Sequence, residues 1–479
     1  MKPPSGPFRA SGPNRAAVVA AAAAALFAGG AGTRVRAALT PGRAPNPASA
    51  PAVPEPDSPA ASSEFAAKPE PPPSQAAVKI EPAVNEWVLA NTGFALDLLH
   101  RLGPADANLA FSPYSAAAAL ALVYEGARGR TAAELAQALG LPPSLCAPPD
   151  RSSPTLAAAV SGLRTRLGAV DQGSATLLLA DALWYQSGLK LDGAYLAAAR
   201  GPFGATIEPL DFRNDPAASA AAINAWVDRS TQHRITRLFE SNAGGPHRSD
   251  AGGANRLKPE TSLVIADAVY FRSHWASEFK PRNTRPAPFR LDPDTSSLTP
   301  MMRQTGRFQL LELPQASLLD LPYRDGLLSM TVILPKAVDG LAKLEAQMRT
   351  NDLLAWLAQL DFATEQEVSV MLPRFRIENG LDLVAPLRAM GVSAVFDRAA
   401  SDLSGMIATP RLSVDKAYQK VWLDVDEQGT EAAAATGISV AGFAVHRSLS
   451  FHADHPFLFL IRERSTGSLL FLGRFAKPQ

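Results

Sequence analysis

The sequence predicts an α+β fold for residues 83–479, because helical and strand-like apolar patterns both occur in a long chain. Apolar residues recur at helical spacing in 85–102, whereas short apolar runs of strand length occur at 263–271, 328–334 and 367–372. The chain has 479 residues, of which 47% are hydrophobic, so it can bury a large core. Length alone would allow about three domains. The patterns therefore predict helices in the first half and strands after them.

The N-terminus has the residue order of a secretory signal. Basic residues, the last of them Arg15, precede an apolar run at 16–28, and small residues follow as far as Ala38. This order predicts cleavage after Ala31 or Ala37. Because the apolar run is short for a bilayer-spanning helix, an uncleaved membrane anchor is the less favoured alternative.

The chain is therefore expected to have three parts. Residues 1–38 are the signal peptide or anchor, and residues 39–82, rich in Pro, Ala and Ser, are an extended, disordered tether. Residues 83–479 form the folded domain. We expect this domain to be secreted or to lie in the periplasm or cell envelope, held at a membrane if the signal stays uncleaved.

Capping residues indicate where the first helices begin. Ser112 precedes Pro113 and an Ala-rich run, which suits a serine cap with proline in the first turn. Thr131 and Glu134 have the spacing of a capping box for the next helix. A strand pattern follows at 176–185. The glycine-rich polar stretch 240–257 is predicted to be a flexible insertion.

Charge and motif content argue against several functional classes. Lys and Arg number 46 against 45 Asp and Glu, so nothing favours nucleic acid or a membrane surface as partner. The sequence lacks a Gly-rich phosphate loop, zinc-type Cys/His spacing and a Gly-x-Ser-x-Gly elbow. His452 and His455 are three apart on an expected strand, where they point to opposite faces. Cys146, the only cysteine, is expected to be inert. We expect no cofactor, no metal and no catalytic residue.

Residues 427–442 are the most informative segment. Alternate residues are small, β-branched or apolar, and the other parity carries Glu431 and Ser439. This period of two allows a strand with one buried face. The alanines and glycines give weak β-propensity, so the segment need not be a strand at rest. We interpret it as a loop that can join a sheet later, although composition alone would favour a surface linker.

Further blocks along the chain make it similar to the serpin family of protease inhibitors. Strand patterns at 420–426 and 456–461 bracket the informative segment, and a turn at 465–468 between apolar runs predicts a hairpin. The similarity covers residues 84–478. The other blocks are Asn108–Ser115, Glu125–Leu135, Ile223–Val227, Asp267–Phe271, Trp275, Phe279, Asn283–Thr284, Leu321–Tyr323, Met330–Pro335 and Leu372–Phe375.

This resemblance implies a single serpin domain with three β-sheets, about nine helices and an exposed reactive-centre loop. It also implies a suicide mechanism, in which a target serine protease cleaves the loop and is trapped as a covalent acyl-enzyme. The loop then inserts into the central sheet of a metastable, monomeric protein, which is not itself an enzyme. The implied loop hinge comprises Glu427, Gly429, Thr430, Glu431, Ala432, Ala433, Ala434, Ala435 and Thr436, and its small residues fit the inhibitory pattern.

The resemblance also implies the position of the reactive bond. Counting from Gly429 places it between Phe443 and Ala444. Phenylalanine before the bond suits a chymotrypsin-like or subtilisin-like protease with an apolar primary pocket, which would not bury an unpaired charge. A longer effective loop would instead present Arg447 to a trypsin-like protease.

Five positions match residues that control sheet opening in serpins. Those at Ser112 and Ser115 lie behind the strands that part, and Trp275 matches an aromatic residue where the loop enters, although an ordinary core tryptophan fits equally well. The family usually has Asn at Asp267 and His at Gln419. We expect the Asp267 carboxylate to accept a hydrogen bond from the Gln419 amide. A buried carboxylate should then alter the resistance of the sheet to opening.

Two other functions remain open from the sequence. A non-inhibitory carrier or chaperone-like binding protein with a serpin fold is the main alternative, and a bulky hinge would favour it. A hydrolase is the other, and the missing catalytic constellation argues against it.

Overall fold

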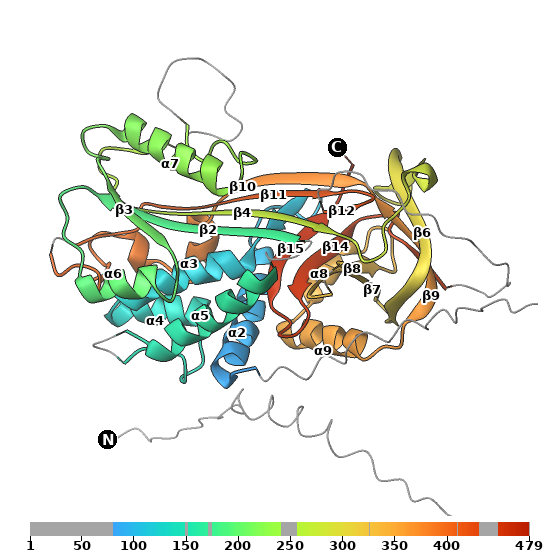
Figure 1. Ribbon diagram of the computed structural model, residues 1–479, viewed down its shortest axis with the longest axis horizontal. Coiled ribbons are helices and arrows are strands. Elements are labelled where there is room, and N and C mark those ends of the chain that lie inside the picture. Colours follow the sequence, from blue (N-terminus) through green and yellow to red (C-terminus); the bar gives the residue numbers. More distant parts are fainter. Residues whose placement is uncertain are drawn as a thin grey trace, which may run out of the picture. The chain divides into compact units, whose positions relative to one another are not determined.

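The computed structural model describes residues 80–148, 152–170, 175–240, 256–324, 326–409, 411–430 and 449–478 (Figure 1). The expected signal and nearly all of the expected tether lie outside these residues. Among the described residues, no helix combines the length and apolar character needed to cross a bilayer.

The fold is of the α+β class, and its described part contains nine α-helices. They are α2 (Pro82–Leu99), α3 (Pro113–Gly126), α4 (Gly129–Ala138), α5 (Pro154–Val170), α6 (Gly193–Arg200), α7 (Pro216–Ser230), α8 (Leu341–Gln347), α9 (Thr350–Asp361) and α10 (Val384–Ala389). Helix α2 begins three residues before the predicted start at residue 85 and ends three residues before the predicted end at residue 102.

One predicted helix cap is confirmed and the other is wrong. Ser112 caps α3, because its side chain accepts a hydrogen bond from the Ser115 amide. Helix α4 begins two residues before Thr131, so Thr131 and Glu134 do not form a capping box. Thr131 instead accepts from the Asp402 amide, and the Glu134 carboxylate accepts from the amide of Ser393. Both side chains therefore bind segments that are distant in the sequence instead of capping α4.

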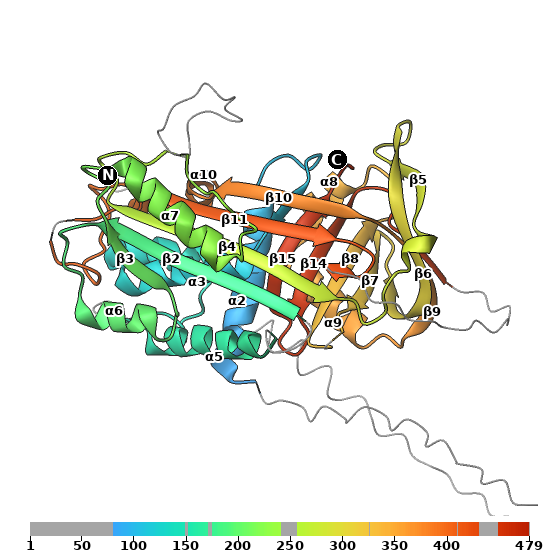
Figure 2. The same cartoon turned by 45° about the horizontal axis from the view of Figure 1, so that its top comes forward.

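A six-stranded sheet forms the centre of the molecule, in the order β10-β11-β12-β4-β2-β3 (Figure 2). Its strands are β2 (Ala175–Gln186), β3 (Thr206–Leu210), β4 (Leu263–His274), β10 (Phe375–Asp382), β11 (Lys416–Val425) and β12 (Gly429–Thr430). Strands β4 and β11 run parallel and pair directly over seven residues, and the two-residue β12 separates them only at one end. We call the direct boundary between β4 and β11 the opening line.

The other strands form a nine-stranded sheet, so the three implied sheets appear here as two hydrogen-bonded sheets. The reason is the 17-residue β6, which pairs with β9 through residues 301–308 and with β7 through 309–312. It thereby joins two sheets into one ladder. The nine strands are β1 (Leu109–Phe111), β5 (Arg285–Arg290), β6 (Ser296–Glu312), β7 (Ala316–Pro322), β8 (Leu328–Pro335), β9 (Gln366–Pro373), β13 (Leu449–His452), β14 (Phe457–Glu463) and β15 (Leu469–Phe475).

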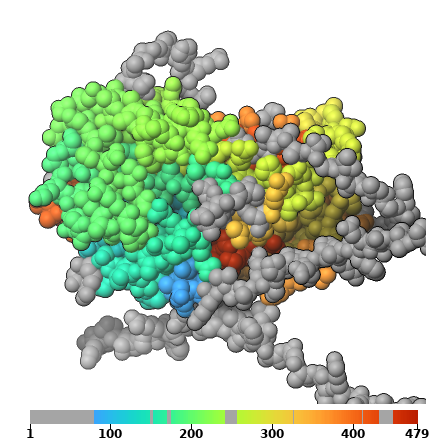
Figure 3. Space-filling model, viewed as in Figure 1, coloured from blue at the N-terminus to red at the C-terminus, as the bar shows by residue number. Residues whose placement is uncertain are grey.

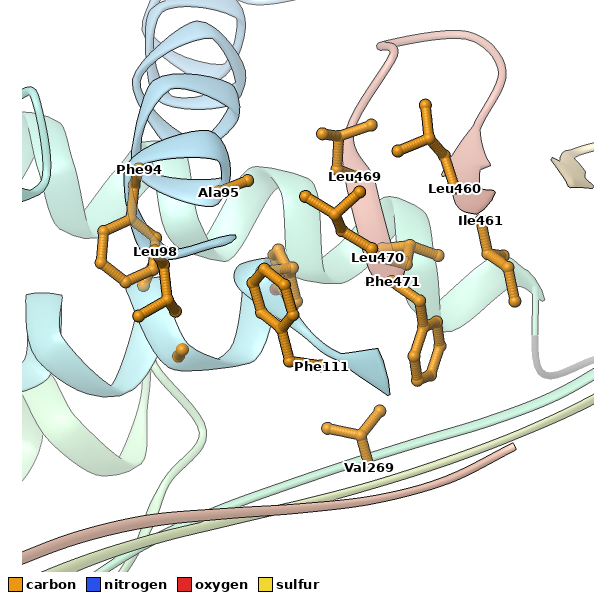
Figure 4. Packing of buried hydrophobic residues seen from close by; sticks show 14 of the residues in the cluster. Phe94, Ala95, Leu98, Phe111, Val269, Leu460, Ile461, Leu469, Leu470 and Phe471 are labelled. Atoms are coloured by element: carbon orange, nitrogen blue, oxygen red, sulfur yellow. The ribbon is translucent and has the colours of Figure 1, made fainter. Parts of the chain in front are cut away.

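Side chains of the six-stranded sheet alternate between two cores, as the period of two requires. On β4, Ile265 and Val269 join the main core, whereas Ala266 and Ala268 join a smaller core. Helices α3 and α5 lie on the first face and α7 on the second (Figure 1). In the main core, Val269 lies near Phe111 and the strands β14 and β15 (Figure 4). The helical layer therefore backs the opening line directly.

Candidate functional site

A tight turn leads from β11 back into the middle of its own sheet. Strand β11 ends at Val425, and β12 returns antiparallel to it, with Thr430 opposite Val425. The Asp426 amide donates to the Gly429 carbonyl oxygen over 2.8 Å. The Asp426 carboxylate accepts from the amides of Gln428 (2.9 Å) and Gly429 (3.2 Å). We call residues 426–429 the hinge turn.

Burial acts against the ionised form of Asp426. It raises the pKa of this carboxyl above its ordinary value, although the two amides partly offset the effect and the charges of Asp424 and Glu427 add to it. The amides of Gln428 and Gly429 therefore hold the hinge turn by donating to the partly desolvated Asp426 carboxyl group.

Gly429 lies against the backbone of β4. A Cβ atom at this position would stand 1.9 Å from the Ser273 carbonyl oxygen. Gly429 is not among the positive-φ glycines of the described residues, so close approach, rather than an unusual backbone angle, requires glycine here. The hinge turn can enter between β4 and β11 only because this side chain is absent.

Thr430 is the first loop residue that is fully inside the sheet. It is completely buried, and its Oγ1 lies 2.8 Å from the Tyr323 hydroxyl. The Tyr323 ring stacks on Trp275 with centroids 4.8 Å apart and planes 6° apart. Trp275 Nε1 in turn donates to the Asp426 carbonyl oxygen over 3.0 Å. These two aromatic side chains thus hold the start of the loop from both ends of the hinge turn.

Two more contacts fix the outer side of the hinge turn. The Phe279 amide donates to the Glu427 carbonyl oxygen over 2.8 Å, and the Thr284 hydroxyl donates to the Glu427 carboxylate over 2.7 Å. Glu427 is consequently buried despite its charge. Of the expected hinge residues, the structure describes Glu427, Gly429 and Thr430, and it brings them together.

The other expected loop residues lie outside the described part of the chain. These are Glu431, Ala432, Ala433, Ala434, Ala435 and Thr436 of the hinge, the expected reactive bond between Phe443 and Ala444, and the alternative Arg447. The chain is described again from β13, which pairs with β9 at the edge of the nine-stranded sheet. The reactive-bond residues therefore remain predictions.

Polar side chains link the two sides of the opening line. Gln419 Nε2 donates to Asp267 Oδ2 over 2.5 Å and to the Ser112 carbonyl oxygen over 2.9 Å. The Ser112 amide donates back to Gln419 Oε1 over 2.8 Å. Ser115 is also buried here, although its hydroxyl has no hydrogen-bond partner among the described residues. The structure thus brings together all four expected residues behind the sheet.

Asp267 stands in surroundings that oppose its ionisation. Desolvation raises the pKa of Asp267 well above its ordinary value, and the nearby Asp181 carboxylate raises it further, whereas the bond from Gln419 acts in the opposite direction. Sequence reasoning missed Asp181. The available signal was an acid on the apolar parity of the strand pattern at 176–185, between Leu179 and Leu183.

Of the two histidines before β14, His455 is held by local hydrogen bonds. His455 is buried, with Nδ1 2.8 Å from Asp454 Oδ1 and Nε2 2.8 Å from the Pro335 carbonyl oxygen. His452 lies on β13. In the described ranges, no three His, Cys, Asp or Glu side chains are grouped to hold a metal ion.

Comparison with known proteins gives one consistent result. The family model described as serpin (serine protease inhibitor) matches residues 89–478. Human Serpin B11 is 33% identical over 400 residues, which cover 81% of this chain and 98% of that protein. The horse leukocyte elastase inhibitor is 33% identical over 403 residues, covering 81% and 98%.

Solved structures agree on the fold. Serpin48 of the insect Tenebrio molitor superposes with a TM-score of 0.69 at 28% identity, covering 84% of this chain and all of that one. Maspin gives a TM-score of 0.73 at 24% identity, covering 83% and 100%, and shows the fold alone.

Proposed function

The chain belongs to the serpin family, and from this premise we propose that it inhibits serine proteases as a suicide substrate. Serpins are protease inhibitors rather than enzymes, although non-inhibitory members also occur. The observation that carries the proposal is the state of the central sheet. Its opening line is closed, yet the loop already enters it as β12, in which Thr430 pairs with both β4 and β11 and Gly429 pairs with β4. An inserting strand therefore has a place to begin.

Cleavage starts the proposed mechanism. The serine hydroxyl of the target protease attacks the carbonyl carbon before the reactive bond, which we place at Phe443. An ester forms, the peptide bond to Ala444 breaks, and the new amine leaves with residues 444–479. The inhibitor supplies no nucleophile. What it supplies is the free segment that ends in the acyl-enzyme.

Insertion then follows the register that β12 has begun. Thr430 lies opposite Ser273 of β4, so six residues further along the same register Thr436 would face Asp267 on one side and Gln419 on the other. Residues of the parity of Thr430 would face the helical layer, and these are the small Ala432, Ala434 and Thr436. Each inserted residue adds ladder hydrogen bonds and buries side-chain area.

The length of the loop sets how far the protease would move. Residues 429–443 span roughly 50 Å as a strand, at about 3.3 Å per residue. A protease tethered at Phe443 would be carried that far, and its active site would be distorted before the ester hydrolyses. The partner in this proposal is one target serine protease for each inhibitor monomer.

Specificity is proposed from the residue before the bond. Phe443 fits an apolar primary pocket of a chymotrypsin-like or subtilisin-like enzyme, and Arg447 is the alternative for a trypsin-like enzyme. The similarity to a leukocyte elastase inhibitor supports a serine protease as the target.

The test is incubation with a chymotrypsin-like and a trypsin-like protease, followed by denaturing gels. We expect an adduct that survives denaturation with the first enzyme, and sequencing of the released fragment should begin at Ala444. Clean cleavage without an adduct would indicate a non-inhibitory binding protein instead. Turnover of an added substrate without protease would indicate a hydrolase.

Export is a separate part of the proposal. Residues 1–38 would direct the chain out of the cytoplasm, and residues 39–82 would tether the domain or precede it in solution. Sequencing the N-terminus of the protein recovered from culture medium and from membranes tests this. A mature N-terminus near residue 32 or 38 supports a cleaved signal, and an intact N-terminus in the membrane fraction supports an anchor.

A further inference from the structure

A row of three polar side chains crosses the apolar face of the six-stranded sheet. Asp181 of β2 lies opposite Asp267 of β4 in antiparallel register, and Gln419 of β11 lies beside Asp267 across the opening line. We call these three residues the polar row. Two positions away on each strand, on the same face, the residues are apolar and lie in or against the main core: Leu179, Leu183, Ile265, Val269, Ala417 and Val421.

Two oxygens of the polar row have no hydrogen-bond partner in the described part of the chain. They are Oδ1 of Asp181 and Oδ1 of Asp267, and both are shielded from solvent. Ionised carboxylates only accept hydrogen bonds, so two of them cannot satisfy each other. A proton held on one acid lets it donate to the other, as neighbouring carboxyl groups do when both cannot ionise. The opposed register places these acids where such a bond can form.

The charges that face the acid pair are few. Helix α3 contributes Tyr114, whose pKa burial raises above its ordinary value, with the charge of Asp181 adding to the effect. Helix α5 contributes Arg164, and β11 contributes only the neutral Gln419. Burial raises the pKa of Asp181 to about 7, while Arg164 acts to lower it. Asp267 has no cation among its perturbing groups, and desolvation and the charge of Asp181 raise its pKa well above the ordinary value.

We propose that Asp181 and Asp267 form a proton-sharing acid pair that holds the sheet closed, and that release of protons from this pair lets the opening line part more readily as pH rises. The pair ties β2 to β4, and the bond from Gln419 carries the same row across to β11. The closed sheet shields Asp267 and Oδ1 of Asp181 from water, and an opened sheet would hydrate them. The closed sheet therefore binds protons more tightly, and each proton lost to solvent favours opening.

This inference deepens the proposed function, since it concerns the sheet into which the loop would insert. Opening can nevertheless be measured without a protease. A synthetic peptide with the sequence of residues 429–443 should anneal between β4 and β11 of the intact full-length protein. The rate of annealing, followed on native gels, reports on parting of the opening line.

We expect the annealing rate to rise as pH increases from about 4 to 7, by up to about tenfold for each unit by which opening lowers the pKa of the pair. Asp181→Asn and Asp267→Asn should each make this dependence less steep, because each removes one of the two titrating groups. Asn at 267 can still accept from Gln419 and can donate to Asp181, so that variant should fold. An equally steep dependence in both variants would overturn the proposal.

Two control variants separate other sources of pH dependence. Glu208→Gln removes an exposed carboxylate from β3 of the same sheet and should leave the dependence unchanged. Glu125→Gln removes a buried acid of α3 whose pKa burial also raises to about 7, and it should leave the dependence on the acid pair in place.

A second measurement keeps this proposal distinct from the inhibitor proposal. The free energy of unfolding in urea should fall as pH rises from about 4 to 7 in the parent protein, and it should fall less in either Asn variant. Loss of that difference counts against the acid pair even if the peptide never anneals. Absence of a protease adduct, with the pH effects intact, counts against inhibition alone.

Discussion

At Gly429 a single methyl group would collide with the backbone of the neighbouring strand. We expect Gly429→Ala to destabilise the native protein by about 1–3 kcal/mol, because a Cβ 1.9 Å from the Ser273 carbonyl oxygen forces β4 and β12 apart. Urea unfolding measures this. Gly168→Ala is the matched control, since its Cβ would meet nothing within 4 Å. Equal stability of the two variants would contradict the close approach.

A substitution at Thr430 tests the trapping of a protease, as the substitution at Gly429 tests stability. Thr430→Arg would put an unpaired charge at a position that is already buried beside Tyr323, which costs several kcal/mol. We expect β12 to leave the sheet, so that insertion loses its starting pairs and slows by more than about tenfold. The variant should then be cleaved as a substrate and released, whereas Thr430→Ser should still trap the protease. The ratio of adduct to cleaved inhibitor on denaturing gels gives the result. Equal trapping by both variants would argue against β12 as the starting point of insertion.

Sequence reasoning reached some of these residues and not others. It could place Gln419 against Asp267, because the resemblance aligned both positions with a contact across two strands. It could not find Asp181 as the partner, because which acid faces Asp267 depends on the register between β2 and β4. It named Gly429 only as a small hinge residue, because the distance to Ser273 is a property of the assembled sheet.

Among the elements, β4 and β11 are the pair that the proposed mechanism must separate. Val269 and Val421 are register partners across the opening line, both fully buried. Adjacent strands are about 4.8 Å apart, within the reach of a disulfide. In a Cys146→Ser background, we expect Val269→Cys with Val421→Cys to give a protein that is cleaved without forming an adduct when oxidised, and that recovers trapping when reduced.

The control for this lock joins strands that need not part. Leu183 and Ile265 are register partners on β2 and β4, so cysteines there should oxidise without loss of trapping. If both locks abolished trapping, general rigidity would explain the loss. If neither did, insertion between β4 and β11 would be the wrong step.

The prediction of elements succeeded where local signals agree with tertiary structure. Apolar spacing predicts the α+β class. The cap at Ser112 could be predicted because its side chain accepts a hydrogen bond from the helix that directly follows it. The capping box at Thr131 failed because distant segments offered both side chains other partners. The count of sheets could not be predicted either, since it depends on how β6 divides its pairing between β7 and β9.

For the whole molecule, the proposed mechanism requires that the intact protein is not in its lowest free-energy state. Cleavage near Phe443 should raise the melting temperature by at least about 10 °C, because inserted residues each add about 0.5–1.5 kcal/mol in net hydrogen bonding, besides burial. Calorimetry of intact and cleaved protein tests this. Thr430→Arg, cleaved in the same way, should show a smaller rise in melting temperature. If cleavage left the melting temperature of the parent protein unchanged, loop insertion would have no driving force.

In the view of Figure 3, the residues from α5 to α7, in teal and green, occupy one side of the face, and the yellow residues around β6 occupy the other. Around β4, β11 and β12, the described part of the chain brings together the acid pair, the Asp426 carboxyl group and the stack of Trp275 on Tyr323.

The hairpin that joins β11 to β12 has a kinetic consequence. The first pair of residues is usually the slow step in adding a strand to a sheet, since two separate segments must meet before pairing can spread. Here Val425 and Thr430 are already paired, so a cleaved loop would only have to extend the pairing. In the proposed mechanism, loop insertion competes with hydrolysis of the ester. The slow formation of the first strand pair would then be complete before the protease binds.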